Sequence, residues 1–296
     1  MKIFDCFMYF DEDIVLDLRL NCLNDYVDKF IIVESKYTHS GKSRKLNFDI
    51  KKFEKFKKKI HYLILDREPP DIEQIKHSDN ENIRNNKYIL NGMKRDFFQR
   101  NFIMSGLNDA YDNDFILVSD LDEIPKLNNI NFDEIKEKFV FFKQKMFYYK
   151  FNLCSETVHW TGTRGCRKKD LKSPQWLRNI KDRIYPLWRL DLIFSKNKYS
   201  NIRFIENGGW HFSYIKTPEQ IEKKLKSYAH HREYELSQIG IQKIRQKIED
   251  KESIYDLKTD MKKSKFDSGQ KLVPLKLNEL PVYIQNNKEK FKLWLD

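Results

Sequence analysis

Short apolar runs alternate with longer amphipathic stretches over the first 125 residues. We predict strands at residues 2–8, 29–34, 61–66 and 115–119, and helices at residues 11–24 and 91–111, the first capped by Asp11. The polar stretch 69–86 has no strong period and is predicted to be a loop. Alternating strands and helices favour right-handed crossovers, so this half predicts a mostly parallel sheet flanked by helices, an α/β fold.

The pattern changes after Pro125. Strands are predicted at residues 139–153, 157–166 and 185–194, a basic loop at 167–183, and a Gly-Gly turn before an aromatic strand at 210–212. Thr217 and Pro218 are typical of a helix start, and that helix is predicted to reach about residue 236, with another at 238–248. We therefore predict one main domain, residues 1–215, and a helical C-terminal extension, residues 216–296.

The composition is that of a folded protein with an aromatic core. Hydrophobic residues make up 40% of the 296 residues, with 22 Phe and 15 Tyr. No segment has the roughly 20 consecutive apolar residues that a membrane helix needs, and acids interrupt any signal-peptide pattern near the N-terminus. We therefore expect no transmembrane segment and a cytoplasmic protein. The four cysteines lack metal-site spacing and are expected to be buried free thiols.

The net charge of +12 is compatible with an anionic partner. The basic residues are dispersed along the chain, however, and no nucleic-acid-binding motif is present. The densest run, residues 51–59, is typical of the solvated face of a helix. We therefore expect no nucleic-acid partner, which leaves an anionic membrane surface or phosphorylated substrates as possible anionic partners.

The strand predicted at residues 115–119 ends in a cluster of acids. Asp120, Asp122 and Glu123 follow four apolar residues directly. If the chain stays extended, Asp120 and Asp122 point to the same side, where two carboxylates are tolerated when a hard divalent cation binds between them. Ligands of open α/β sheets bind beyond the carboxyl ends of the strands. The alternative is a polar exit from a buried strand.

Three motifs together resemble one family. These are Gln-Arg-Asn at 99–101, Ser-Asp-Leu-Asp-Glu-Ile-Pro at 119–125 and Gly-Gly-Trp-His at 208–211. An Arg-Asn helix before an Asp-x-Asp strand resembles the glycosyltransferases of the GT-A fold, and the full set is similar to glycosyltransferase family 17 over residues 2–235. The animal members carry a membrane anchor that this chain lacks, so a different acceptor is expected.

The resemblance implies a Rossmann-like GT-A domain over residues 1–215. Residues 1–125 would form the nucleotide-sugar half and residues 126–215 the acceptor half. The implied activity is a metal-dependent, inverting transfer of N-acetylglucosamine from UDP-N-acetylglucosamine to a glycan hydroxyl, with Mn²⁺ or Mg²⁺ as cofactor. Two alternatives remain open, a metal-dependent hydrolase of nucleotide-sugar or phosphate bonds and a non-catalytic basic binding protein on the same fold.

The resemblance also implies site residues. Asp122 would bind the metal, Asp120 the metal shell or the ribose, and His211 would be a further metal ligand. Arg100 and Asn101 would face the donor nucleotide, unless they are a solvent-facing helical pair.

Other candidate residues each have a structural alternative. The remaining nucleotide-sugar candidates are Glu34, Lys42, Glu123 and Arg164. Glu34 would bind the base or ribose, or else cap the loop 37–41, and Glu123 would reach the donor sugar or hold its loop by hydrogen bonds. Lys42 and Arg164 would contact phosphate or be surface charges. Glu206 is the first candidate for the catalytic base, ahead of Asp191 and Glu156.

Overall fold

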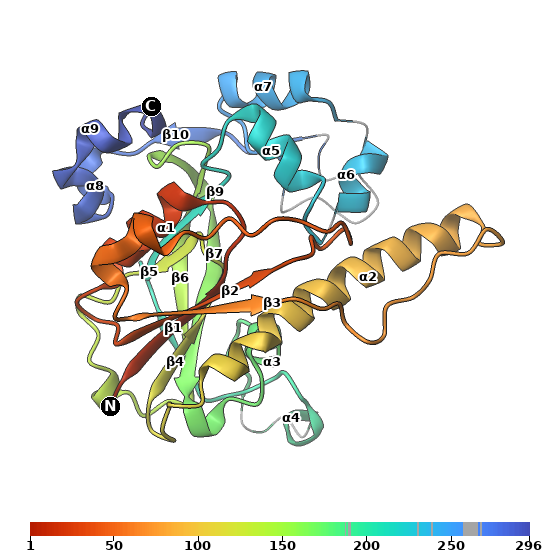
Figure 1. The fold of residues 1–296 in the computed structure, drawn as a ribbon. Coiled ribbons are helices and arrows are strands. Elements are labelled where there is room, and N and C mark those ends of the chain that lie inside the picture. Colours follow the sequence, from red (N-terminus) through yellow and green to blue (C-terminus); the bar gives the residue numbers. More distant parts are fainter. Residues whose placement is uncertain (187, 189–190, 230, 238, 257–265, 267) are drawn as a thin grey trace.

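A computed structural model describes residues 1–186, 188, 191–229, 231–237, 239–256, 266 and 268–296. In these parts of the chain a ten-stranded mixed sheet is flanked by helices on both faces (Figure 1). The predicted α/β class is therefore confirmed. No helix within the described ranges is both long enough and apolar enough to cross a membrane.

The regular elements follow the chain in this order. The first half contains β1 (Ile3–Met8), α1 (Asp13–Leu23), β2 (Lys29–Ser35), β3 (Ile60–Leu65), α2 (Glu81–Asn101), β4 (Phe115–Val118) and β5 (Glu123–Pro125). The second contains β6 (Phe139–Tyr148), β7 (Leu153–Arg167), α3 (Pro174–Asn179), α4 (Asp191–Phe194), β8 (Ile202–Ile205) and β9 (Gly209–Ser213). The C-terminal part contains α5 (Pro218–Leu225), α6 (His231–Ser237), α7 (Ile241–Glu249), β10 (Leu272–Pro274), α8 (Val282–Asn286) and α9 (Lys288–Phe291).

The sheet is parallel in its first half and mixed in its second. Its strand order is β3-β2-β1-β4-β7-β6-β9-β5. All pairings among β3, β2, β1 and β4 are parallel, whereas β7 runs antiparallel to both β4 and β6. Strands β8 and β9 are parallel to β6, and β5 and β10 add antiparallel pairs. The carboxyl ends of β1, β2 and β4 therefore meet at one edge, as the alternating pattern predicts.

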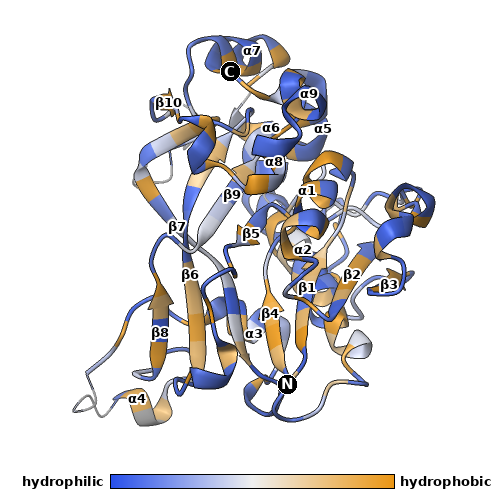
Figure 2. Cartoon of the chain, turned by 90° about the vertical axis from the view of Figure 1, so that its left-hand side faces the viewer, coloured by the Kyte–Doolittle hydropathy of each residue, from blue (hydrophilic) through white to orange (hydrophobic). Residues whose placement is uncertain are grey.

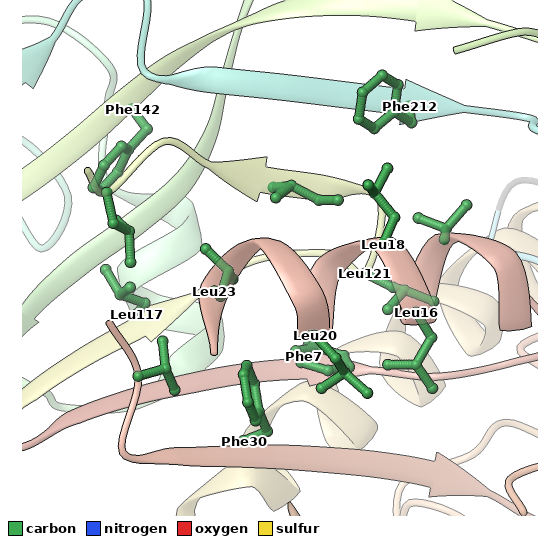
Figure 3. Close-up of a cluster of buried hydrophobic side chains, with 14 of the residues drawn as sticks. Phe7, Leu16, Leu18, Leu20, Leu23, Phe30, Leu117, Leu121, Phe142 and Phe212 are labelled. Carbon is green, nitrogen blue, oxygen red and sulfur yellow. The ribbon is translucent and has the colours of Figure 1, made fainter. Parts of the chain in front are cut away.

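Two apolar layers cover the faces of this sheet. Helix α1 packs its buried leucines between β1, β2 and the segment around β5, and α8 and α9 join the same cluster (Figure 3). On the other face, α3 and the turn after α2 pack against β2, β3 and β4. Apolar colour concentrates on the central strands and on one side of these helices (Figure 2).

The C-terminal segment packs on the main sheet. Helices α5, α6 and α7 share a third apolar cluster with β6 and with the residue after β9. Strand β10 pairs antiparallel with β7, so this segment is not purely helical. The C-terminal segment thereby covers the edge of the sheet where β9 ends.

Helix α2 begins ten residues earlier than predicted. It starts at Glu81, so the predicted loop 69–86 is wrong over its last six residues. Asn80 caps the helix by accepting a hydrogen bond from the Ile83 amide. The early turns lack apolar periodicity because this end of α2 projects away from the sheet (Figure 1). The helix ends at Asn101, where a 3₁₀ turn, Phe102–Gly106, replaces its predicted last turns.

Other boundary predictions also need correction. Residues 191–194 form a short helix instead of a strand, and residues 187 and 189–190 of that predicted strand lie outside the described residues. The predicted loop 167–183 contains α3, with Ser173 as its cap. The long predicted strand 139–153 is divided by a turn after β6.

The predicted helix caps had different outcomes. Thr217 caps α5, as predicted, and does so in a capping box with Gln220. Helix α5 ends at Leu225, however, and α6 is a separate helix. Residue 230 of that long predicted helix, and residue 238 at the start of the next, lie outside the described residues. Glu12 precedes α1 without a side-chain cap, so Asp11 is not the cap. Asp11 pairs with Lys216 instead.

A buried arginine joins α1 to the loop after β4. Arg19 is fully buried, and its Nε and Nη2 atoms donate to both carboxylate oxygens of Asp5 on β1, at 2.8 and 2.6 Å. Its Nη1 atom donates to the carbonyl oxygens of Asp120 (3.0 Å), Leu121 (3.0 Å) and Glu123 (2.9 Å). A buried charge needs hydrogen-bonded partners, and the Asp5 carboxylate and the three carbonyl oxygens provide them for the Arg19 guanidinium. The same hydrogen bonds fix the acidic loop, residues 120–123.

We expect Arg19→Met to lower the free energy of unfolding by about 3–5 kcal/mol, because it leaves the Asp5 carboxylate buried without its partner. Chemical denaturation measures this difference. Lys52→Met is the matched control. It breaks the exposed Lys52–Asp13 pair at the start of the same helix and should change stability by less than about 1 kcal/mol. An Arg19→Met protein as stable as the wild type would contradict the role of this ion pair.

Candidate active site

A cavity of about 370 Å³ opens at the sheet edge where β1, β2 and β4 end. Its walls come from the segments after these strands, from α2, from β9 and from the end of α5. Its lining residues include Phe10, Glu12, Tyr37, His39, Asp96, Arg100, Asp120, Asp122, Trp160, His211, Lys224, Tyr228 and Tyr255. Parallel strands place their carboxyl ends together, which is where such sheets bind ligands.

Asp120 lies between two guanidinium groups. Arg100 Nη2 is 3.1 Å from its Oδ1 atom and Arg178 Nη2 is 3.3 Å from its Oδ2 atom. Burial alone would raise the pKa of Asp120, but Arg178 and Arg100 hold it well below its usual value. About 39% of its side chain remains exposed, so this charged carboxylate still faces the cavity.

Asp122 contacts a histidine and a lysine that are distant in sequence. Its Oδ1 atom is 3.5 Å from His211 Nε2, and its Oδ2 atom is 3.5 Å from Lys224 Nζ, which lies 3.1 Å from Glu12. The Phe212 amide donates to the Asp122 carbonyl at 2.8 Å, so β9 holds His211 beside the acidic loop. Burial would raise the pKa of Asp122, but Lys224 and His211 lower it.

The same charges act on His211. Burial would lower its pKa, but the Asp122 carboxylate outweighs burial and raises it above the ordinary value of 6.5. Its Nδ1 atom is buried and has no hydrogen-bond partner among the described residues. Since buried polar atoms are normally paired, this imidazole has capacity for a ligand.

The Gly-Gly turn allows β9 to approach this loop closely. Gly209 has a φ of 131°, and a Cβ atom there would lie 2.2 Å from the Ile124 carbonyl oxygen. Only glycine meets both conditions without strain. The turn therefore lets β9 carry His211 to the wall of the cavity.

Asp122 and His211 are the pair of residues here that could hold a metal ion. Within the described ranges, no three His, Cys, Asp or Glu side chains gather as a complete metal site. The Asp122 carboxylate suits Mn²⁺ or Mg²⁺, and His211 Nε2, which faces it at 3.5 Å, is a further nitrogen ligand acceptable to Mn²⁺. Mg²⁺ in nucleotide sites takes one or two protein ligands and fills its shell with phosphate oxygens and water. The pair therefore fits a metal that binds together with a diphosphate.

Glu123 is engaged entirely by protein groups. Its Oε2 atom accepts from the Asp120 amide at 2.8 Å and from Arg178 Nη1 at 2.7 Å. Its Oε1 atom accepts from Trp160 Nε1 at 2.6 Å and from Arg178 Nη2 at 2.9 Å. The carboxylate is fully buried and does not line the cavity, so the structure uses it to hold the loop.

The Arg-Asn pair of α2 faces the protein interior. Arg100 is buried, lines the cavity and binds Asp96 and Gln175 as well as Asp120, and the Asp96 and Asp120 charges raise its pKa against the effect of burial. The solvent-facing alternative is therefore wrong for Arg100. Asn101 accepts a hydrogen bond from the Gln175 amide at 3.0 Å and joins α2 to α3 outside the cavity.

Neither Glu34 nor Lys42 lines the cavity. Both Glu34 carboxylate oxygens accept hydrogen bonds, from Arg44 and the Asn47 amide on one side and from the Phe48 amide and Tyr62 hydroxyl on the other. This arrangement fixes the segment after the 37–41 loop. Lys42 is exposed and does not line the cavity.

Arg164 and Glu206 also lie outside the cavity. Arg164 donates to carbonyl oxygens at the C-terminal end of α3, and burial lowers its pKa to about 10. Glu206 is 2.7 Å from Lys143 and lines a different hollow. Asp191 pairs with Lys198, and Glu156 is exposed. The structure therefore brings together Asp120, Asp122, His211 and Arg100, but not these residues.

Sequence reasoning missed three charged residues of the site. Arg178 lies in a segment predicted to be a loop, and nothing in its neighbours marks it as a partner of Asp120. Lys224 lies in the last turn of α5, where a cation is also expected to interact with the helix dipole. Glu12 lies four residues after β1 ends at Met8, among other acids, which was a usable signal for the same sheet edge.

Comparison with known proteins assigns the family. The sequence model of glycosyltransferase family 17 matches residues 1–296. The chain is also 27% identical over 229 residues to the human and rat proteins named beta-1,4-mannosyl-glycoprotein 4-beta-N-acetylglucosaminyltransferase. These alignments cover 72% of this chain and 40% of each relative, so the chain spans less than half the length of the relatives it matches.

The chain belongs to glycosyltransferase family 17. The expected family and the Rossmann-like α/β fold are confirmed together. The motifs that carried the resemblance lie apart in sequence but meet at one cavity.

We expect NMR titration of the chelator-treated protein to give His211 a pKa above 6.5, and Asp122→Asn to lower it, because burial remains while the attracting charge is lost. A raised folded-state pKa stabilises the protein fully below pH 6.5, and that contribution disappears as pH rises through the folded-state value. His231, whose pKa burial lowers, is the internal control and should be unchanged. Equal His211 midpoints in both proteins would show that Asp122 does not hold this proton.

Proposed function

We propose that this protein is a metal-dependent, inverting glycosyltransferase that moves N-acetylglucosamine from its UDP donor to a glycan hydroxyl. The observation that carries the proposal is the convergence of Asp120, Asp122, His211 and Lys224 in one cavity at the carboxyl ends of the parallel strands. This arrangement combines metal-ligand chemistry with cations, as the departure of a diphosphate requires.

The cavity offers separate surroundings for the two ends of a nucleotide-sugar. Aromatic and polar side chains after β1 and β2, including Phe10, Tyr37 and His39, suit a nucleoside. Trp160 and Tyr255 lie among the lining residues contributed by β7 and the C-terminal segment and suit the sugar. Ligand sites of this kind combine apolar walls with a few placed polar groups.

Asp122 and His211 would hold the metal, which supplies positive charge to the departing diphosphate. Lys224 lies 3.5 Å from the same carboxylate and lines the cavity with a partly exposed side chain. With Asp122 holding a metal, the Lys224 ammonium group would keep its Glu12 partner, 3.1 Å away, and would donate to a phosphate oxygen. Arg100 and Arg178 keep Asp120 ionised and oriented.

The relatives support the donor and acceptor classes. The names of these relatives describe transfer of N-acetylglucosamine to a mannosyl-glycoprotein. Because they are 27% identical and much longer, we propose only the donor and the general acceptor, a glycan hydroxyl, for this chain. One fold hosts many specificities, so the acceptor must be found by experiment.

A panel of nucleotide-sugars tested by thermal shift with Mn²⁺ examines the donor, because ligands of the native state raise its apparent stability. UDP-N-acetylglucosamine should give the largest increase in Tm. Release of UDP should then require the metal and rise when glycans are added. UDP release that ignores added glycan would instead indicate a hydrolase.

We expect His211→Ala to need at least tenfold more Mn²⁺ for half-maximal activity and to recover part of its rate at high Mn²⁺, because one metal ligand is lost. In the wild type, Mn²⁺ affinity should fall as pH drops through the raised His211 pKa, since protons compete for the imidazole. A manganese titration measures both. An unchanged half-saturation in His211→Ala would remove this residue from the ligand set.

We expect Lys224→Met to weaken UDP binding at saturating Mn²⁺ by about 1.5–3 kcal/mol, the usual value of a hydrogen bond to a charged group. Lys223→Met is the matched control, because Lys223 is adjacent on α5 but 64% exposed and outside the cavity wall. Calorimetry should show little change for Lys223→Met. Equal losses in both variants would indicate a general field effect and not a contact.

A further inference from the structure

We propose that a second cleft, bordered by β7 and α3, binds the carbohydrate acceptor. It has a volume of about 480 Å³, and Thr157, His159, Trp160, Arg178 and Asp182 are among its lining residues. The inference rests on the proposed transferase function and adds the site and chemical class of the second substrate. A glycan in this cleft would reach the donor cavity from the β7 side.

Trp160 is shared by the two cavities. It lines both, and its ring centroid is 5.5 Å from that of His211. The 2.6 Å hydrogen bond from its Nε1 atom to Glu123 fixes the indole in place. A ligand resting against the cleft side of this ring is therefore one side chain away from the candidate metal ligand His211.

Arg178 provides a second connection. The same guanidinium lines the cleft and lies 3.3 Å from the Asp120 carboxylate, which faces the donor cavity. An acceptor hydroxyl at this end of the cleft would therefore approach the place where the donor sugar and diphosphate join. Transfer requires this juxtaposition, because the two reactants must be held in contact.

Irregular pairing of β7 shapes the cleft. Residue Lys145 of β6 pairs with His159, but the next residue, Met146, pairs with Ser155. Residues 156–158 therefore have no partner on β6 and form a bulge that contributes Thr157 to the cleft. Bulges reorient strands and occur next to active sites, where they redirect side chains.

The cleft chemistry favours neutral, hydroxyl-rich ligands over phosphates. Two guanidinium groups line the cleft, those of Arg164 and Arg178. Arg178 donates to Glu123, Asp120 and the Gly162 carbonyl, and Arg164 donates to three carbonyl oxygens at the end of α3, so both are engaged inside the protein. The accessible polar groups are the exposed side chains of Thr157, His159 and Asp182. An aromatic ring with a few hydroxyl, imidazole and carboxylate groups suits a sugar, which has both apolar faces and hydroxyl edges.

A larger groove provides the competing position. It has a volume of about 780 Å³ and is lined by residues including Tyr26, Asn128 and Trp210. It shares no lining residue with the donor cavity. Its aromatic content makes it a fair control for sugar binding, whereas its location does not explain transfer.

The experiment uses saturation-transfer NMR of the full chain with a panel of mannose- and N-acetylglucosamine-terminated oligosaccharides, without donor. His159→Trp fills the proposed cleft, and Asn128→Trp, also at an exposed position, fills the competing groove. We expect at least a tenfold loss of oligosaccharide affinity in His159→Trp alone, with unchanged affinity for Mn²⁺–UDP. Thermal unfolding checks that both variants fold, and Thr157→Trp, in the same cleft, replaces His159→Trp if that variant does not fold.

Oligosaccharide binding that survives His159→Trp, or that is lost in Asn128→Trp, would overturn the assignment of this cleft. A wild-type protein that binds Mn²⁺–UDP but no oligosaccharide would also overturn it while leaving the donor site intact. A third outcome is a protein that binds no nucleotide-sugar but loses oligosaccharide binding only in His159→Trp. That result would support the cleft and overturn the proposed function.

Discussion

The buried ion pair between Arg19 and Asp5 is the interaction on which the site depends. It places a guanidinium inside the main core and directs its remaining donors to three carbonyl oxygens of the acidic loop. Two charges without water are costly unless they are paired and hydrogen-bonded, so the loop has one favourable position relative to β1. The edge of the sheet that carries the cavity is therefore tied to the core by electrostatics as well as by packing.

The loop that Arg19 fixes carries carboxylates whose charges are balanced by neighbouring cations. The fixed loop presents Asp120 to two arginines and Asp122 to His211 and Lys224. Each carboxylate is kept ionised by its cations in spite of burial. Such a site can exchange one positive partner for another, a lysine for a metal ion, without leaving an uncompensated buried charge.

The C-terminal segment completes the cavity. Lys224, Tyr228 and Tyr255 lie beyond the predicted main domain and still line the cavity. They are held there because α5, α6 and α7 share an apolar cluster with the main sheet. The segment cannot be treated as a dispensable appendage, since its removal would open the cavity and take away a cation of the site.

Local pattern was sufficient to predict the class of fold and the centre of the site. The apolar runs and helical periods predicted the parallel strands of the first half. The Asp-x-Asp and Gly-Gly-Trp-His motifs pointed to Asp122 and His211, because strand ends and glycine turns have recognisable local sequences. Tertiary structure alone decided which other residues join them. Glu34 and Glu206 were both candidate site residues from the sequence. The fold uses Glu34 as a buried anchor and places Glu206 in an exposed ion pair. Arg178 and Lys224 reach the site through packing of helices far along the chain, and such long-range contacts depend on the shape of the whole core and not on neighbouring residues.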